Sequence, residues 1–154
     1  MFKVNIYIET TVKGPAKRNG TYGSVLEYKG QTIHTREKFG ELQETTHNQS
    51  TLTALLDAIS LLNNPCNIEV FTDNKYIASV FESNWLLEWT TNNWKTAKGQ
   101  DVKDKELWQK LNIYVILHSI KITVTKNHEY SDWMNAEMKR RESHERATIP
   151  QTDN

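Results

Sequence analysis

The 154-residue sequence contains very little cysteine and has no excess of charge of either sign. Its single thiol, Cys66, cannot form an internal disulfide, so a reducing, cytoplasmic setting is expected. Lysine plus arginine equals aspartate plus glutamate at 19 each, so global charge gives no attraction to nucleic acid or to an anionic membrane. Any nucleic-acid binding must therefore come from a local basic patch and will weaken as salt rises.

Long apolar runs are also missing. No run approaches the roughly 18 residues of a membrane-spanning helix, so no membrane association is expected. Lys3 and Asn5 interrupt the first apolar residues too early for a signal peptide. One cysteine and five scattered histidines do not form a zinc-binding pattern. The length fits one domain, predicted over residues 1–146, with a disordered polar tail over 147–154, and nothing in the sequence requires more than a monomer.

Alternating apolar and polar residues predict strands in the first quarter of the chain. Residues 2–9 place four apolar side chains on one face and polar ones on the other, as a strand with a period of two requires. A loop with turn residues follows, and further strands are predicted at about 22–28 and 31–39. Together these segments predict a three-stranded antiparallel meander.

The remainder of the chain alternates helical and strand patterns. Leucine and isoleucine residues from Leu52 to Leu62 form one apolar stripe at helical spacing, and Ile68 to Phe71 form a short strand. A strand, a crossover helix and another strand predict that the first and fourth strands are parallel. The later predicted elements are helices at about 74–81, from Asp104, and at 131–146, and a fifth strand at 120–124.

Four segments resemble ribonuclease H type 1. They are the Thr-Thr-His-Asn opening of the helix at 45–62, the Phe-Thr-Asp-Asn-Lys-Tyr-Ile run at 71–77, the tryptophan-rich stretch at 85–111, and Thr-Lys-Asn-His at 125–128. The resemblance covers about residues 3–142. It implies an α/β, RNase H-like fold: a five-stranded mixed sheet of order 3-2-1-4-5, with three antiparallel strands and then parallel ones, flanked by helices.

The family that this sequence resembles cleaves the RNA strand of an RNA–DNA hybrid. The resemblance implies two Mg²⁺ (or Mn²⁺) ions held by four carboxylates, with one ion activating water and the other stabilising the leaving oxygen. Mg²⁺ prefers oxygen ligands, and two nearby cations need several negative charges to offset their repulsion. The number of carboxylates present therefore decides whether this chemistry can operate.

Two acidic residues match the family's ligands at strand ends. Glu9 lies where the family has an aspartate ending its first strand, and Asp73 matches the aspartate ending its fourth. Those strands should be neighbours, with their carboxyl ends at the crevice where such sheets bind ligands. Glu9 and Asp73 are thus predicted to share a metal ion, although the additional methylene of Glu9 could displace it.

The third carboxylate is absent from the first helix. Thr51 stands where the family has a glutamate, and threonine is a poor Mg²⁺ ligand. Asp57 cannot replace it, because six residues rotate a helical side chain by about 240°. Thr51 therefore predicts weakened metal binding, and weak or absent cleavage.

The fourth carboxylate position is assigned to Glu137. It follows Ala136, as the family's aspartate follows alanine or cysteine, but it lies one residue closer than usual to His128. The alternative is that Glu137 is a solvated helix charge and that Asp132 is the fallback ligand. His128 resembles the family's loop histidine, which assists proton transfer or product release; its alternative is an exposed loop residue.

Five residues match positions that contact the substrate in the family: His47, Asn48, Lys75, Trp85 and Lys95. Asn48 could contact the 2′-hydroxyl that marks RNA, but Thr46 or Asn48 could equally cap the helix. Trp85 could pack within the tryptophan-rich segment instead of meeting nucleic acid. That segment carries few cations, so a weakened grip on phosphates is expected.

Three functions follow from these patterns. The first is an RNase H-like nucleic-acid-binding domain whose two-metal endonuclease activity is weak or lost. The second is an active hybrid ribonuclease with an altered metal shell of Glu9, Asp73 and Glu137. The third is a non-catalytic scaffold for a protein partner.

Overall fold

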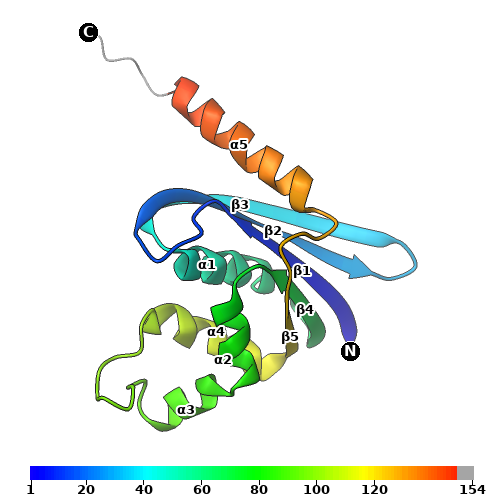
Figure 1. The fold of residues 1–154 in the computed structure, drawn as a ribbon. Coiled ribbons are helices and arrows are strands. Elements are labelled where there is room, and N and C mark those ends of the chain that lie inside the picture. Colours follow the sequence, from blue (N-terminus) through cyan, green and yellow to red (C-terminus); the bar gives the residue numbers. More distant parts are fainter. Residues whose placement is uncertain (149–154) are drawn as a thin grey trace.

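The alternating N-terminal segment forms the central strand of a five-stranded sheet. In the computed structural model, which describes residues 1–148, β1 (Phe2–Thr10) pairs antiparallel with β2 (Arg18–Lys29) and parallel with β4 (Cys66–Thr72). β3 (Ile33–Thr45) pairs antiparallel with β2, and β5 (Ser119–Val124) pairs parallel with β4. The order β3-β2-β1-β4-β5 confirms the predicted topology (Figure 1).

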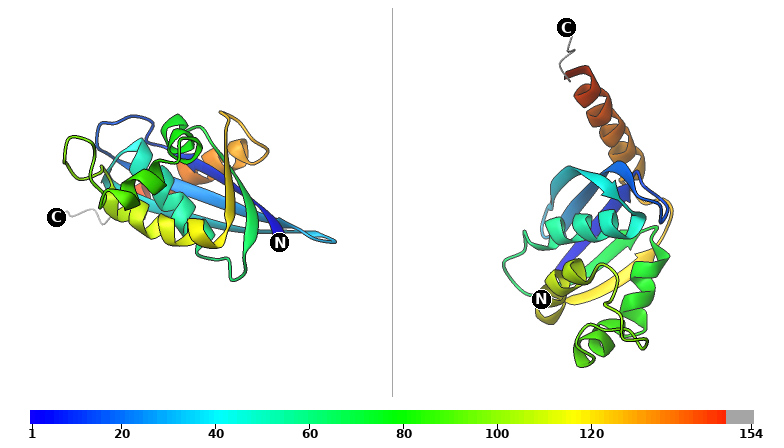
Figure 2. Two further views of the ribbon diagram at one scale, coloured as in Figure 1. Left: turned by 90° about the horizontal axis from the view of Figure 1, so that it is seen from below. Right: turned by 90° about the vertical axis from the view of Figure 1, so that its left-hand side faces the viewer.

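Helices cover both faces of this sheet. α1 (His47–Ile59), α2 (Lys75–Glu82), α3 (Trp85–Thr91) and α4 (Lys105–Leu117) lie on one side, and α5 (Ser131–Thr148) lies on the other (Figure 1). The two views in Figure 2 show the same arrangement, with the far end of α5 extending away from the sheet. The apolar face of β1 and the leucine stripe of α1 form the main core, in which Ile6, Leu52 and Leu55 are fully buried.

The start of α1 is fixed by a capping box. Thr46 is the N-cap: its Oγ1 accepts from the backbone N–H of Gln49 at 3.1 Å, and the Gln49 side chain accepts from the Thr46 N–H at 3.3 Å. Of the two predicted capping residues, Thr46 is the one used. The cap sets where His47 and Thr51 lie on α1.

Several elements differ in extent from the pattern-based prediction. β2 and β3 form a longer hairpin than expected, with a register shift between Arg18 and Gly20, because pairing continues after apolar alternation has ended. Asp104 precedes α4 in a left-handed conformation and makes no capping hydrogen bond; its Oδ1 instead accepts from Gln49 Nε2. α5 continues through Thr148, and the rest of the predicted tail, 149–154, lies outside the described residues.

The tryptophans of residues 85–108 pack on one another. Trp85, Trp89 and Trp94 form a chain of ring contacts with centroids 6.1–6.3 Å apart, and Trp89 meets the fully buried Trp108 edge-on at 5.5 Å. Trp85, Trp89 and Trp94 therefore pack within the segment while staying partly buried, and contact of Trp85 with nucleic acid stays a prediction. In residues 1–148 there is no helix with the length and apolar character needed to cross a bilayer.

Candidate active site

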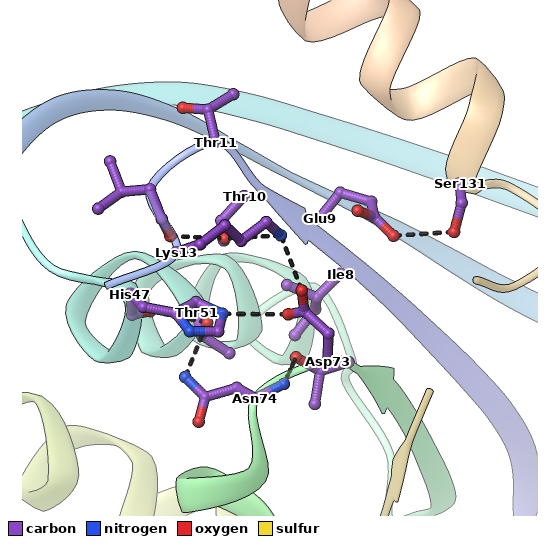
Figure 3. Close-up of polar contacts among 12 residues, drawn as sticks. Ile8, Glu9, Thr10, Thr11, Lys13, His47, Thr51, Asp73, Asn74 and Ser131 are labelled. Carbon is purple, nitrogen blue, oxygen red and sulfur yellow. Dashed lines mark hydrogen bonds and ion pairs between the residues drawn. The ribbon is translucent and has the colours of Figure 1, made fainter. Parts of the chain in front are cut away.

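The ends of β1 and β4 bring the two predicted strand-end carboxylates to one edge of the sheet. Tyr7 is paired with Phe71 in the parallel register, so Glu9 and Asp73, each two residues further on, reach the same level. Thr51 of α1 faces this edge from one side of the sheet, and the start of α5 approaches it from the other (Figure 3). Side chains from β1, β4, α1 and α5 thus meet here.

Asp73 is held by two basic side chains of the protein. Lys13 Nζ lies 2.9 Å from its Oδ2, and His47 Nε2 lies 3.0 Å from its Oδ1 (Figure 3). The hydrogen bond from His47, opposed by partial burial and reinforced by Lys13, holds the pKa of Asp73 far below its usual range. Both oxygens of the carboxylate therefore already have a positively polarised partner.

The depressed pKa of Asp73 predicts a defined loss of stability in acid. A carboxylate whose pKa is lowered on folding stabilises the protein above its unfolded pKa, about 3.9, and that contribution disappears as pH falls through the folded value. Asp73→Asn should lower the unfolding free energy at pH 7 by about 1–2 kcal/mol, and the difference from the parent should shrink below about pH 4. Urea unfolding at several pH values measures this; a pH-independent difference would contradict it.

Glu9 is buried among hydrogen-bond donors from the loop before α5 and from α5 itself. Ser131 Oγ donates to its Oε2 at 2.8 Å, His128 Nε2 lies 2.9 Å from the same oxygen, and Asn135 Nδ2 donates to Oε1 at 3.4 Å. The Tyr130 backbone N–H donates to His128 Nδ1 at 3.2 Å, so that nitrogen is the acceptor and Nε2 carries the proton. His128 Nε2 is thus the ring nitrogen that donates to the Glu9 carboxylate.

Thr51 is part of the same polar network but brings no negative charge to it. Its hydroxyl donates to the His47 carbonyl at 2.8 Å and accepts from Asn74 Nδ2 at 3.3 Å, and the residue is 1% exposed. Asn74 also caps α2 through its Oδ1. At the position of the missing glutamate, α1 therefore presents a buried neutral hydroxyl that is already hydrogen-bonded within the protein. Asp57 faces elsewhere and accepts from the Tyr22 hydroxyl at 2.7 Å.

Glu137 is not brought to this edge. Its carboxylate pairs with Arg140 at 2.6 Å and Arg141 at 2.8 Å, and the hydrogen bond from Arg140 is the main reason that its pKa falls to about 2. Asn135, two residues earlier and therefore about 200° around the helix, faces Glu9 instead. Asp132, the fallback residue, is exposed.

The donor set does not fit a pair of Mg²⁺ ions. Mg²⁺ sites use carboxylates and water, whereas here a hydroxyl and an amide occupy two of the positions around Glu9 and Asp73. Both remaining carboxylates accept hydrogen bonds within the protein. Among residues 1–143, whose side chains the structure describes, no group of three or more His, Cys, Asp or Glu has a metal-binding arrangement.

The predicted substrate-contact residues have varied environments, and two of them, His47 and Asn48, lie at this edge. His47 is bound to Asp73, and the Asn48 Oδ1 accepts from Asn74 Nδ2 at 2.9 Å. Lys75, the first residue of α2, is exposed. The structure leaves Trp85 half-buried beside Tyr76, and pairs Lys95 with Asp101 at 2.6 Å.

Sequence patterns did not identify four residues of this site: Lys13, Asn74, Ser131 and Asn135. The spacing within α5 could have indicated two of them. Met134 and Met138 are buried four residues apart, and Ser131 and Asn135 are separated by the same interval on the helix. No comparable signal marks Lys13, because a loop backbone sets its direction.

A mixed sheet of the order β3-β2-β1-β4-β5, flanked by helices on both faces, is the RNase H-like fold that the sequence resembled. The RNase H family model matches residues 2–140. The chain is 39% identical to Ribonuclease H of Clostridium botulinum, over 88% of this chain and 90% of that one, and 33% identical to Ribonuclease H of Acetivibrio thermocellus, over 88% and 89%. The chain belongs to the RNase H family.

Solved structures show the same fold. LC9-RNase H1, described as a type 1 RNase H with the type 2 active-site motif, superimposes with a TM-score of 0.73 at 20% identity, covering 91% of this chain and 72% of that one. The solution structure of the PFV RNase H domain gives 0.65 at 18% identity, covering 91% and 92%. At these identities the likeness concerns the fold alone.

Proposed function

We propose that this RNase H-family protein binds RNA–DNA hybrids, or related nucleic acid, with little or no metal-dependent cleavage. The supporting observation is that Glu9 and Asp73, the two carboxylates left at the site, are both engaged by side chains of the protein. A metal ion would have to displace these contacts. It would also lack two of the negative charges that a two-metal site uses, because Thr51 and Asn135 are neutral. A cytoplasmic monomer is the form we expect to act.

Hybrid recognition is supported by the fold and by basic groups near the edge. A foamy viral protease–reverse transcriptase solved with an RNA/DNA hybrid shares the fold, with a TM-score of 0.66 at 19% identity. A hollow of about 160 Å³ beside the site is lined by Lys13, His47, Asn48 and Lys103 among others. Cationic and amide groups of this kind suit phosphates and sugar hydroxyls.

The test is a binding and cleavage assay on the parent protein. A fluorescein-labelled RNA–DNA hybrid should bind in EDTA at low salt, with an affinity that falls steeply as salt rises. The same hybrid, incubated with Mg²⁺ or Mn²⁺ and resolved on a denaturing gel, should remain intact. A double-stranded DNA of the same length is the control for hybrid preference.

A second candidate is an active hybrid ribonuclease, which the 39% identity to Ribonuclease H of Clostridium botulinum favours. Multiple turnovers at millimolar Mg²⁺ would establish it and overturn the first proposal. Absence of hybrid binding at low salt would instead leave the third function, a protein-interaction scaffold. The three outcomes are mutually exclusive in this assay.

A further inference from the structure

Lys13 is a loop residue whose ammonium group lies at the site. The loop after β1 is anchored by Val12, which is 4% exposed, and by Thr10 Oγ1, which donates to the Val12 carbonyl at 3.2 Å. From this anchored turn the Lys13 side chain returns toward the edge of the sheet (Figure 3). Its Nζ lies 2.9 Å from Asp73 Oδ2 and 3.4 Å from Thr10 Oγ1. The cation is thus held by the fold on the carboxylate that ends β4.

The ammonium group retains capacity for a further partner. A lysine Nζ has three donors, and the two contacts to Asp73 and Thr10 account for two of them. The Lys13 side chain is 47% exposed, so the remaining donor can meet a ligand from solvent. The adjoining hollow of about 160 Å³ has no carboxylate in its lining, which includes Lys103 and His47.

A divalent ion at Asp73 would face this fixed positive charge at close range. Lys13 and His47 already occupy the two oxygens of Asp73, and Thr51 adds no negative charge that would offset the repulsion. The ammonium group of Lys13, with a single positive charge, thus lies where a two-metal nuclease would need divalent ions. Unlike a metal ion, this cation is covalently part of the chain and needs no loading.

We propose that Lys13 is a tethered cation that binds a nucleic-acid phosphate directly, so that binding at this edge is independent of divalent metal. This rests on the proposed function, because it supposes that nucleic acid reaches the edge. Asp73 is then a positioning residue, which orients the ammonium group and keeps it at the end of β4.

Anisotropy titrations of the labelled hybrid test this, at fixed ionic strength, in EDTA and in 0.1 mM Mn²⁺ (a concentration of about this size perturbs screening little). The parent should bind equally in both. Lys13→Met should weaken binding by about three- to tenfold and reduce the slope of log affinity against log salt by about one. Lys13→Arg should restore most of the affinity and the slope. Lys17→Met is the control, an equal change of charge in the same exposed loop.

The outcomes separate the two proposals. If the parent binds the hybrid and Lys13→Met binds with the same affinity and slope, or Lys17→Met loses as much, the tethered cation is refuted while hybrid binding stands. Parent binding that requires Mn²⁺ would also refute it. If the parent does not bind the hybrid at all, the proposed function fails first. Circular dichroism melting verifies that each variant is folded.

Discussion

The double variant Thr51→Glu/Asn135→Asp should cleave an RNA–DNA hybrid at least about a hundredfold faster than the parent in Mn²⁺ or Mg²⁺, because several kcal/mol of charge stabilisation become available. Thr51 lies on the face of α1 toward Asp73, and Asn135 lies 3.4 Å from Glu9, so both new carboxylates would join the existing pair. Thr51→Glu alone should gain much less, since the neutral Asn135 would still leave the position beside Glu9 without a second negative charge.

The control for this gain of activity is Thr51→Gln/Asn135→Asp, which has a side chain of the same size at residue 51 without its charge. It should remain close to the parent rate. Because Thr51 is 1% exposed, thermal melting must accompany the kinetics to verify that the larger side chain is accommodated. Parent cleavage equal to that of the double variant would show that neutral residues at 51 and 135 do not limit the reaction. Equal rates for the control would show that charge is not the cause of any gain.

The sheet, and the placement of Glu9 and Asp73 at the same edge of it, could be predicted from the sequence. Alternation in residues 2–9 identifies β1, and a crossover helix makes β1 and β4 parallel neighbours. Residues that end adjacent parallel strands must then lie together. The loss of a carboxylate at Thr51 is predicted from the resemblance to ribonuclease H type 1, which has a glutamate at that position of the helix.

The partners of those residues could not be predicted in the same way. Glu137 was chosen from the Ala136-Glu137 pattern, whereas a shift of two residues on a helix turns a side chain to nearly the opposite side, so that Asn135 meets Glu9. Lys13 and His128 depend on loop backbones, which have no periodicity to indicate direction. Their roles come from distances that only the folded chain provides.

Removal of His128 should destabilise the protein even where catalysis is absent. Its side chain is 3% exposed and donates to Glu9, which is 8% exposed, so His128→Ala leaves a buried carboxylate with one donor fewer and an unfilled space. We expect the unfolding free energy to fall by about 2–4 kcal/mol. Urea unfolding followed by tryptophan fluorescence at pH 7.5 measures it, and His34→Ala, at an exposed position of β3, should change it by less than about 0.5 kcal/mol.

A double-mutant cycle with Glu9→Gln identifies the interaction responsible. If His128 acts by satisfying the Glu9 carboxylate, Glu9→Gln/His128→Ala should be more stable than the sum of the single changes predicts, by about 1–2 kcal/mol. Additive losses would mean that His128 stabilises the loop only through its contacts with Tyr7 and Tyr130. A negligible loss in His128→Ala would mean that the histidine is not needed for stability and would favour a catalytic role for it. Strong coupling would instead show that the Glu9–His128 contact stabilises the fold, at an edge of the sheet where the sequence predicted a metal site.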